Sequence, residues 1–266
     1  MQPVAVVGNL SLDLLDGAPP RVGGAAFYCG RALAALDAPA LVVTACALEH
    51  KDVLVGPLES MGLEVGWVEA PTTSTFGMRY RGDVREMWVE AIGPVWTPAD
   101  VERLEPRLAE AGWVHVGGLL RSDFPAETLA ALARGRRLSL DAQGLVRMPG
   151  LGPLQMDADF DPAVLPHLSV LKVSEEEAVA LVGAATPEAL DALGVPEIVL
   201  TLGTRGAIVI AGGAAEHVPA EPPVVPDPTG TGDMFAAAYM VARADGSDPV
   251  EAARRAAGLV ARLLVA

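Results

Sequence analysis

Two glycines and a carboxylate stand together at a point where a helix is expected to begin. The segment Gly230-Thr231-Gly232-Asp233 opens an Ala-rich stretch, for which we expect a helix over Thr231–Ala244. Glycines at a helix start let successive backbone N–H groups point at one spot, and the helix N-terminus adds a partial positive charge. This pattern predicts an anion hole made by the N–H groups of Gly230, Thr231 and Gly232.

Asp233 would repel an anion held at that helix start, so its presence needs a reason. A carboxylate in this place is suited to act as a general base on a hydroxyl that attacks a phosphate. The alternative, which these residues leave open, is that Asp233 only complements the positive end of the helix dipole.

A second polar group follows a predicted strand that ends near Leu140. The segment Asp141-Ala142-Gln143-Gly144-Leu145-Val146-Arg147 offers a carboxylate, an amide and a guanidinium. These groups suit a polyhydroxy substrate or a phosphate, and we expect Gln143 and Arg147 to bind substrate. The alternative is a loop held by an ion pair between Asp141 and Arg147. The four histidines are dispersed and lack the spacing of metal ligands.

The elements that position these residues alternate along the whole chain. Short continuous apolar runs predict buried strands at Val4–Val7, Ala40–Ala45, Trp113–Val116, Leu138–Leu140, Val170–Val173, Ile198–Thr201 and Ala207–Ile210. Amphipathic or capped stretches predict helices at Gly24–Leu36, Val53–Met61, Ala99–Glu110, Pro125–Ala133, Glu175–Leu181, Pro187–Leu193, Thr231–Ala244 and Pro249–Leu264. This alternation predicts one α/β protein with a mainly parallel sheet covered by helices on both faces.

Residues 72–92 interrupt the alternation with a pattern of polar and apolar residues around Arg81-Gly82-Asp83. The pattern predicts a half-exposed hairpin with a turn at these three residues. A hairpin alone is marginally stable in water, so it should cover something. These residues agree equally well with a lid over a cleft and with a hairpin that extends into solvent. We expect residues 148–166, which are rich in Pro, Gly and Asp, to form a long loop.

Composition excludes several classes of function. The 266 residues are 51% hydrophobic and 20% charged, which is typical of a folded chain, and the net charge of −15 disfavours nucleic acid and anionic membranes as partners. No apolar run reaches the roughly 18 residues that cross a bilayer. The first residues predict a strand rather than a signal peptide, and two cysteines cannot form a disulfide framework. We expect a soluble cytoplasmic protein that is a monomer or a homodimer.

The segment Asp227-Pro228-Thr229-Gly230-Thr231-Gly232-Asp233 resembles the signature of the pfkB carbohydrate kinases, the ribokinase-like kinases. The usual form is Asp-Thr-Thr-Gly-Ala-Gly-Asp, so only Pro228 and Thr231 differ inside it. Other marks of the family occur in the expected order, at Gly8–Asp13, Gly23–Ala26, Leu171–Glu177 and Thr201–Ala207. Together these marks span residues 8–233.

The resemblance implies a ribokinase-like three-layer sandwich in a single domain, residues 1–266, with a small β lid from segments of about 10–22 and 70–94. It implies ATP-dependent phosphorylation of a hydroxyl on a small polyol or sugar, with Mg²⁺ as cofactor. The site residues that it implies for substrate and nucleotide are Asp13, Gly23, Gly24, Thr201, Gly203 and Gly206. It also implies Glu177 as a magnesium residue acting through water and Asp227 as a residue near a monovalent cation.

One further nucleotide residue comes from the Ala-rich helix Pro249–Leu264. Its small side chains, Ala257 among them, would offer a flat wall to adenine, and plain core packing is the alternative.

Departures from the family pattern point to one branch. Ser174 stands where Asn is usual, Tyr28 stands where ribokinase has a polar Asn, and only residues 14–22 separate Asp13 from Gly23. These features are similar to those of the myo-inositol kinases, so a neutral cyclitol is the expected acceptor and Tyr28 is expected to contact it. A nucleoside is the second candidate acceptor and a sugar phosphate the third. A catalytically silent sugar- or nucleotide-binding protein on this fold is the alternative function.

Overall fold

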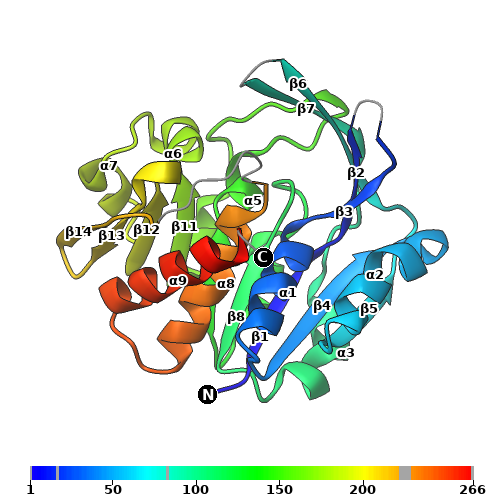
Figure 1. Ribbon diagram of the computed structural model, residues 1–266, viewed down its shortest axis with the longest axis horizontal. Helices are drawn as coiled ribbons and strands as arrows, with labels where there is room; N and C mark the ends of the chain where they lie inside the picture. The colour runs from blue at the N-terminus through cyan, green and yellow to red at the C-terminus, as the bar shows by residue number, and fades with distance from the viewer. Residues whose placement is uncertain (1, 16–17, 82–83, 222–228, 265–266) are drawn as a thin grey trace.

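Among residues 2–15, 18–81, 84–221 and 229–264, which the structure describes, nine strands form the main sheet of this computed structural model (Figure 1). Their order is β14-β13-β12-β11-β9-β8-β1-β4-β5. The strands are β1 (Val4–Asn9), β4 (Ala40–Cys46), β5 (Glu64–Glu69), β8 (Trp113–Gly117), β9 (Arg137–Asp141), β11 (Val170–Ser174), β12 (Glu197–Thr201), β13 (Ala207–Ala211) and β14 (Ala214–Val218). Among these strands, β13 runs antiparallel to both of its neighbours, β12 and β14, and all the other neighbouring pairs are parallel.

The seven strands expected from apolar runs are confirmed, with ends that differ by at most two residues. The two edge strands of the main sheet, β5 and β14, were not predicted. Edge strands are partly exposed, and β14 is exposed at four of its five positions. Such strands lack the continuous apolar run that marks a strand buried on both faces.

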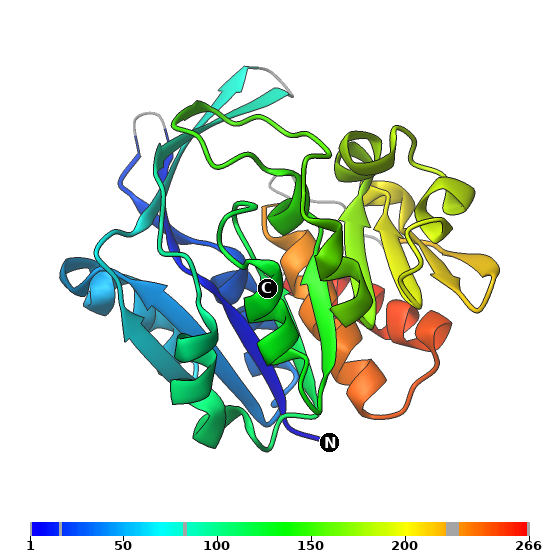
Figure 2. The same ribbon diagram turned by 180° about the vertical axis from the view of Figure 1, so that it is seen from behind.

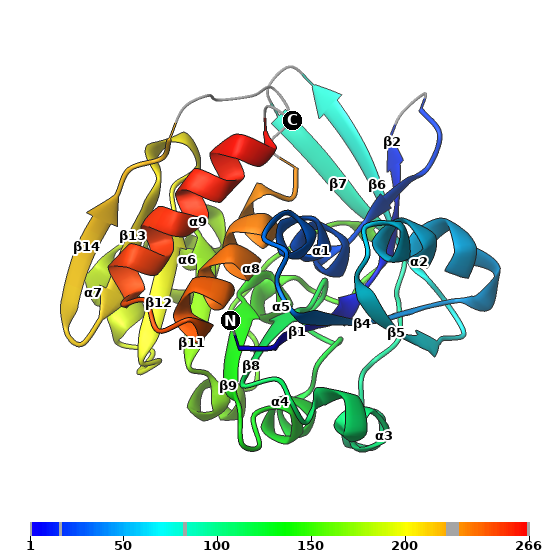
Figure 3. The same ribbon diagram turned by 60° about the horizontal axis from the view of Figure 1, so that its bottom comes forward.

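Helices cover both faces of the main sheet, as expected (Figures 1, 2 and 3). One face carries α1 (Ala25–Ala35), α2 (Lys51–Ser60), α8 (Thr231–Ala244) and α9 (Pro249–Leu263). The other carries α3 (Pro98–Leu108), α4 (Ala126–Leu132), α6 (Glu175–Val182) and α7 (Pro187–Asp191). All eight helices were predicted to within two residues at each end, and only the short α5 (Gln143–Val146) was missed. None of the described helices is both long and apolar enough to span a membrane.

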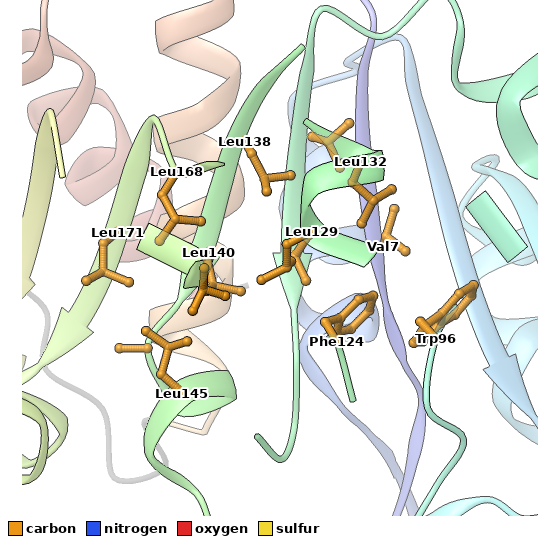
Figure 4. Packing of buried hydrophobic residues seen from close by; sticks show 14 of the residues in the cluster. Val7, Trp96, Phe124, Leu129, Leu132, Leu138, Leu140, Leu145, Leu168 and Leu171 are labelled. Atoms are coloured by element: carbon orange, nitrogen blue, oxygen red, sulfur yellow. The ribbon is translucent and has the colours of Figure 1, made fainter. Parts of the chain in front are cut away.

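Two apolar clusters hold the three layers together. Figure 4 shows part of the cluster between the sheet and the second helical face, where aliphatic strand residues meet an aromatic pair. In that pair, Trp96 and Phe124 stack with ring centroids 5.7 Å apart. The second cluster lies under α1, α2, α8 and α9. Because both faces are buried, the sheet is a fixed platform for side chains at its strand ends.

A small sheet of five strands stands beside the main sheet, in the order β10-β7-β6-β2-β3. Its strands are β2 (Ser11–Leu15), β3 (Arg21–Gly23), β6 (Ser74–Arg81), β7 (Val84–Ala91) and β10 (Gly152–Pro153). The predicted hairpin is confirmed as β6–β7, and it is the centre of a larger sheet. β2 pairs with β6, and β10 pairs with β7. Residues 82–83 of its expected turn lie outside the described residues.

The segment expected to be a long loop, residues 148–166, is therefore not irregular throughout. It contributes β10 to the small sheet and begins a 3₁₀ helix, η2 (Pro162–His167). Pairing with a strand distant in the sequence is not visible in local composition, and this is why the prediction failed here.

Close contacts between small residues join the central strands to α1. A Cβ atom on Gly117 at the end of β8 would lie 2.4 Å from the Cβ of Ala25, and one on Gly8 would lie 2.7 Å from the carbonyl oxygen of Gly117. Such distances leave no room for a side chain, so α1 packs against the sheet at backbone distance.

We predict that Gly117→Ala lowers the free energy of unfolding by about 1–3 kcal/mol, the usual cost of overpacking. The matched control is Gly56→Ala inside α2, where an added Cβ meets nothing within 4 Å. This control should raise stability by about 0.5–1 kcal/mol, because alanine loses less entropy in a helix. Urea unfolding of both variants measures the difference, and equal stabilities would contradict the close packing described above.

Candidate active site

The first turn of α8 is built against the ring of Tyr28 on α1. Gly230 caps the helix in the left-handed conformation, with φ 77°. A Cβ atom at Gly230 would lie 2.1 Å from Cγ of Tyr28. Both the conformation and the contact require glycine here, so Tyr28 fixes where α8 begins. Thr231 and Gly232 follow in the first turn, as the sequence pattern predicts.

Asp233 lies in that first turn and lines a pocket. The start of α8 lies at the end of the main sheet that faces the small sheet (Figure 1). The pocket brings together most of the residues predicted to bind substrate. Its lining consists of Ser11, Asp13, Gly24, Ala25, Tyr28, Phe76, Met78, Met87, Leu119, Gln143, Arg147, Thr229, Gly230 and Asp233. Phe76, Met78 and Met87 come from the small sheet, so that sheet forms one wall of the pocket. Met78, Met87 and Leu119 were not predicted, since apolar residues in a strand or turn carry no local sign of a site.

Asp13 lies in β2 and is buried. Its Oδ1 accepts a hydrogen bond of 2.8 Å from the hydroxyl of Ser11. A Cβ atom on Gly23 would lie 2.2 Å from Oδ2 of Asp13, and one on Gly24, where φ is +93°, would lie 2.6 Å from the carbonyl oxygen of Asn9. The Gly-Gly pair thus allows the chain to pass directly beside this carboxylate. Gly24 lines the pocket. Gly23 is not among the lining residues, and its lack of a side chain leaves room for the carboxylate of Asp13.

Gln143 begins the short helix α5, which follows β9, and Arg147 is the C-cap residue at its end. Gln143 is buried, and its backbone N–H donates to Oδ1 of Asp141 at 3.2 Å. The N–H of Arg147 donates to the carbonyl oxygen of Gln143 at 3.1 Å, which closes the helix. This turn brings both residues to the lining of the same pocket.

Lys172 is a site residue that was not predicted from the sequence. Its Nζ donates a 3.0 Å hydrogen bond to Oδ2 of Asp141, and both side chains are buried. A Cβ atom on Gly232 would lie 2.9 Å from the same Nζ. The ammonium group therefore lies directly behind the first turn of α8. The available signal was an isolated lysine, one of two in the chain, inside the apolar strand Val170–Val173.

Asp141 is thereby paired with Lys172, and the alternative ion pair between Asp141 and Arg147 is not found among the ion pairs of the described residues. Burial lowers the pKa of Lys172, but the carboxylates of Asp141, Glu177 and Asp233 outweigh burial and raise that pKa above its usual range. Lys172 is a permanent positive charge at this point.

The pKa of Asp233 is raised to about 7. Removal of the carboxylate from water is the largest cause, and the negative charge of Asp141 adds to it. The positive charges of Lys172 and Arg147 oppose the shift. A carboxylate with a pKa near neutrality can both accept and release a proton at physiological pH, which is the requirement for a general base.

The residues predicted to bind nucleotide lie at the end of β12, in the turn that follows it and on α9. Thr201 ends β12, and its hydroxyl donates to the carbonyl oxygen of Val173 at 3.3 Å. Gly203 and Gly206 have φ of +58° and +96°, and a Cβ atom on Gly206 would lie 2.1 Å from the carbonyl oxygen of Val218. Ala257 is half-buried on α9, which packs against β13 and β14. None of these four residues lines the pocket of Asp233.

The Glu177 carboxylate is buried at the start of α6. Its Oε2 accepts from the N–H of Ser174 at 2.8 Å, and the Ser174 hydroxyl accepts from the N–H of Glu177. The described residues contain no cluster of three or more His, Cys, Asp or Glu side chains that could hold a metal ion. Magnesium usually keeps several waters and binds few carboxylates, so a single acidic side chain that acts through water fits it. Asp227, the residue predicted near a monovalent cation, lies outside the described residues.

Comparison with known proteins agrees with this arrangement. The model of the pfkB family carbohydrate kinases matches residues 69–265. Ribokinase of Bacillus subtilis (strain 168) is 26% identical over 285 residues, which cover 100% of this chain and 93% of the relative.

Two solved structures show the same fold. One is a pyrophosphate-dependent kinase in the ribokinase family, complexed with a pyrophosphate analog and myo-inositol. It matches with a TM-score of 0.85 and 25% identity, over 98% of this chain and 95% of that chain. The other is Arabidopsis thaliana ribokinase complexed with ribose and ATP, with a TM-score of 0.76 and 21% identity, over 100% and 93%. The expected ribokinase-like fold is confirmed, and the chain belongs to the pfkB family of carbohydrate kinases.

Proposed function

We propose that this sugar or polyol kinase transfers a phosphoryl group to a hydroxyl of a small neutral cyclitol of the myo-inositol type. The observation that carries the proposal is the pocket that Asp233 lines together with Asp13, Gln143 and Tyr28. A carboxylate and an amide around one space suit several hydroxyl groups, because they accept and donate hydrogen bonds without requiring a charged ligand. The aromatic ring of Tyr28 suits the C–H face of a ring.

The small sheet supports this assignment. Phe76 and Met78 are buried and, with Met87, close the pocket on one side. We propose that the small sheet acts as a lid that keeps water from the reacting groups while the acceptor is bound. Lid and main sheet would then work as one kinase domain over residues 1–266.

In the proposed reaction, Asp233 removes the proton from the attacking hydroxyl as its oxygen bonds to phosphorus. The bond from phosphorus to the leaving oxygen of the donor breaks in the same step. Backbone N–H groups of Gly230, Thr231 and Gly232 hold the negative charge that develops on the phosphoryl oxygens. The ammonium of Lys172 adds positive charge behind Gly232. Alignment and charge stabilisation supply most of the rate in such transfers.

ATP is the proposed donor, held beside the turn that contains Gly203 and Gly206 and along α9 at Ala257. Pyrophosphate is a second candidate donor, favoured by the likeness to a pyrophosphate-dependent kinase at a TM-score of 0.85. Magnesium, when bound with either donor, neutralises phosphate charge, and Glu177 would hold it through water.

We expect Asp233→Asn to lower turnover by about 10²–10⁴-fold, because the amide keeps the size of the side chain but cannot accept the proton. Stability at neutral pH should not fall, because the raised pKa of Asp233 means that its charged form is disfavoured in the fold and asparagine removes that charge. The matched control is Asp248→Asn, which changes the Asp that caps α9 and should keep normal turnover. Steady-state kinetics and thermal melting decide, and near-normal turnover in Asp233→Asn would remove this residue from the mechanism.

The raised pKa of Asp233 also predicts a pH dependence. The base must be deprotonated to act, so kcat/KM for the acceptor should rise about tenfold per pH unit up to about pH 7 and then level off. An aspartate of ordinary pKa would give a flat profile over the same range. The measurement uses saturating donor and magnesium from about pH 5 to pH 8, with melting curves to confirm that the protein is folded. A flat profile would contradict the role of Asp233.

The test of the acceptor is a coupled assay of cyclitols, pentoses, hexoses, hexose phosphates and nucleosides, each with ATP and with pyrophosphate. We expect myo-inositol or a related cyclitol to give the highest kcat/KM. The same assay with Asp233→Asn measures the background rate that does not depend on this base. The proposed acceptor class is wrong if a nucleoside or a sugar phosphate exceeds every cyclitol by about tenfold or more, a difference of about 1.4 kcal/mol in transition-state binding.

A further inference from the structure

Within the part of the chain that the structure describes, the guanidinium of Arg147 is unpaired, unlike the charged groups of Lys172 and Arg121. Lys172 is paired with Asp141, and Arg121 is paired with Asp157. Among the described residues, no carboxylate forms an ion pair with Arg147, and the buried Nε atom of this side chain has no hydrogen-bond partner. A buried donor or charge without a partner is costly. This cost is tolerated where a ligand supplies the missing partner.

The surroundings of Arg147 show where that ligand would lie. The side chain lines the same pocket as Asp233. Its positive charge lowers the pKa of Asp233 and also that of Asp123, although burial leaves both pKa values raised overall. The guanidinium is therefore close enough to Asp233 to affect its pKa, but the ion pairs of the described residues include none between the two.

The backbone on both sides of Arg147 is fixed. Its N–H donates to the carbonyl oxygen of Gln143 at 3.1 Å, and its own carbonyl oxygen accepts from the N–H of Arg121 at 2.9 Å. Arg147 also forms an isolated bridge with Met156, in the segment that continues from β10. A guanidinium on so fixed a backbone loses little freedom when it binds an anion.

Charge then identifies the anion. A neutral cyclitol needs hydrogen-bond partners, which Asp13 and Gln143 supply, but it brings no negative charge for a guanidinium. The group that must carry negative charge into this space is the phosphoryl group on its way to the acceptor. We propose that Arg147 is a catalytic residue that binds the transferring phosphoryl group and stabilises its charge in the transition state. The proposal rests on the proposed function, because it assumes a neutral acceptor.

In this role, Arg147 donates N–H hydrogen bonds to phosphoryl oxygens and keeps its own protons. The acceptor proton goes to Asp233, and the electron pair of the broken bond goes to the donor. The guanidinium would act from the acceptor side, opposite the N–H groups of α8. A planar guanidinium suits two oxygens of one phosphoryl group, which lysine cannot match.

The test compares Arg147→Ala and Arg147→Lys with Arg107→Ala, which removes a guanidinium between β5 and α3, outside the pocket. For both Arg147 variants we expect kcat at saturating acceptor to fall about 10²–10³-fold, the usual effect of losing one donor to a developing negative charge. The acceptor KM should stay within about threefold, since ground-state binding is unchanged. Added guanidinium ion should raise the kcat of Arg147→Ala by at least about tenfold. Arg107→Ala should have the kcat and KM of the wild type.

An unchanged kcat with a raised acceptor KM would overturn the proposal and make Arg147 an acceptor-binding residue. A lower kcat that guanidinium ion does not restore, together with a lower melting temperature, would make its role structural and would also overturn the proposal. The proposed function fails separately, if wild-type enzyme phosphorylates only acidic sugars. The same kcat and KM comparison, made with that acidic sugar, then decides the role of Arg147.

Discussion

The buried ion pair between Lys172 and Asp141 is the interaction on which the rest of the site depends. The two side chains are 8% and 1% exposed, and their 3.0 Å contact lies directly behind Gly232. Neither charge is tolerable in the interior without the other, and removal of one partner from such a pair costs about 3–5 kcal/mol. Because the partners come from β9 and β11, the pair also fixes these strands against the first turn of α8.

The same charges decide what Asp233 can do. Asp141 and burial raise its pKa, while Lys172 and Arg147 limit the rise, so that the carboxylate becomes a base near neutral pH. The topology brings these groups together, because β1, β9, β11 and β12 are parallel strands. Their carboxyl ends therefore lie at the same end of the main sheet. Ligand sites in α/β sheets form at this carboxyl end of the strands. The helices behind it keep the strand ends in place.

Local signals predicted much of this arrangement. The glycines and the carboxylate before an Ala-rich run gave the start of α8 at Thr231, and continuous apolar runs gave the seven inner strands of the main sheet. The pairing of Asp141 with Lys172 was not predictable, because the two residues are 31 positions apart and only the parallel register brings them together. The addition of β10 to the small sheet escaped prediction for the same reason. Long-range pairing depends on the whole topology, which composition and spacing do not contain.

The most direct test of this account is the titration of Asp233 itself, followed by NMR of carboxyl carbons in ¹³C-labelled protein. Comparison with Asp233→Asn assigns the signal, and the measurement needs neither donor nor acceptor. We expect a midpoint near pH 7, because burial and the negative charge of Asp141 raise the pKa of this carboxyl group. A midpoint near the ordinary value of about 4 would contradict it. The carboxylate would then be solvated and the charges at the start of α8 would not control it.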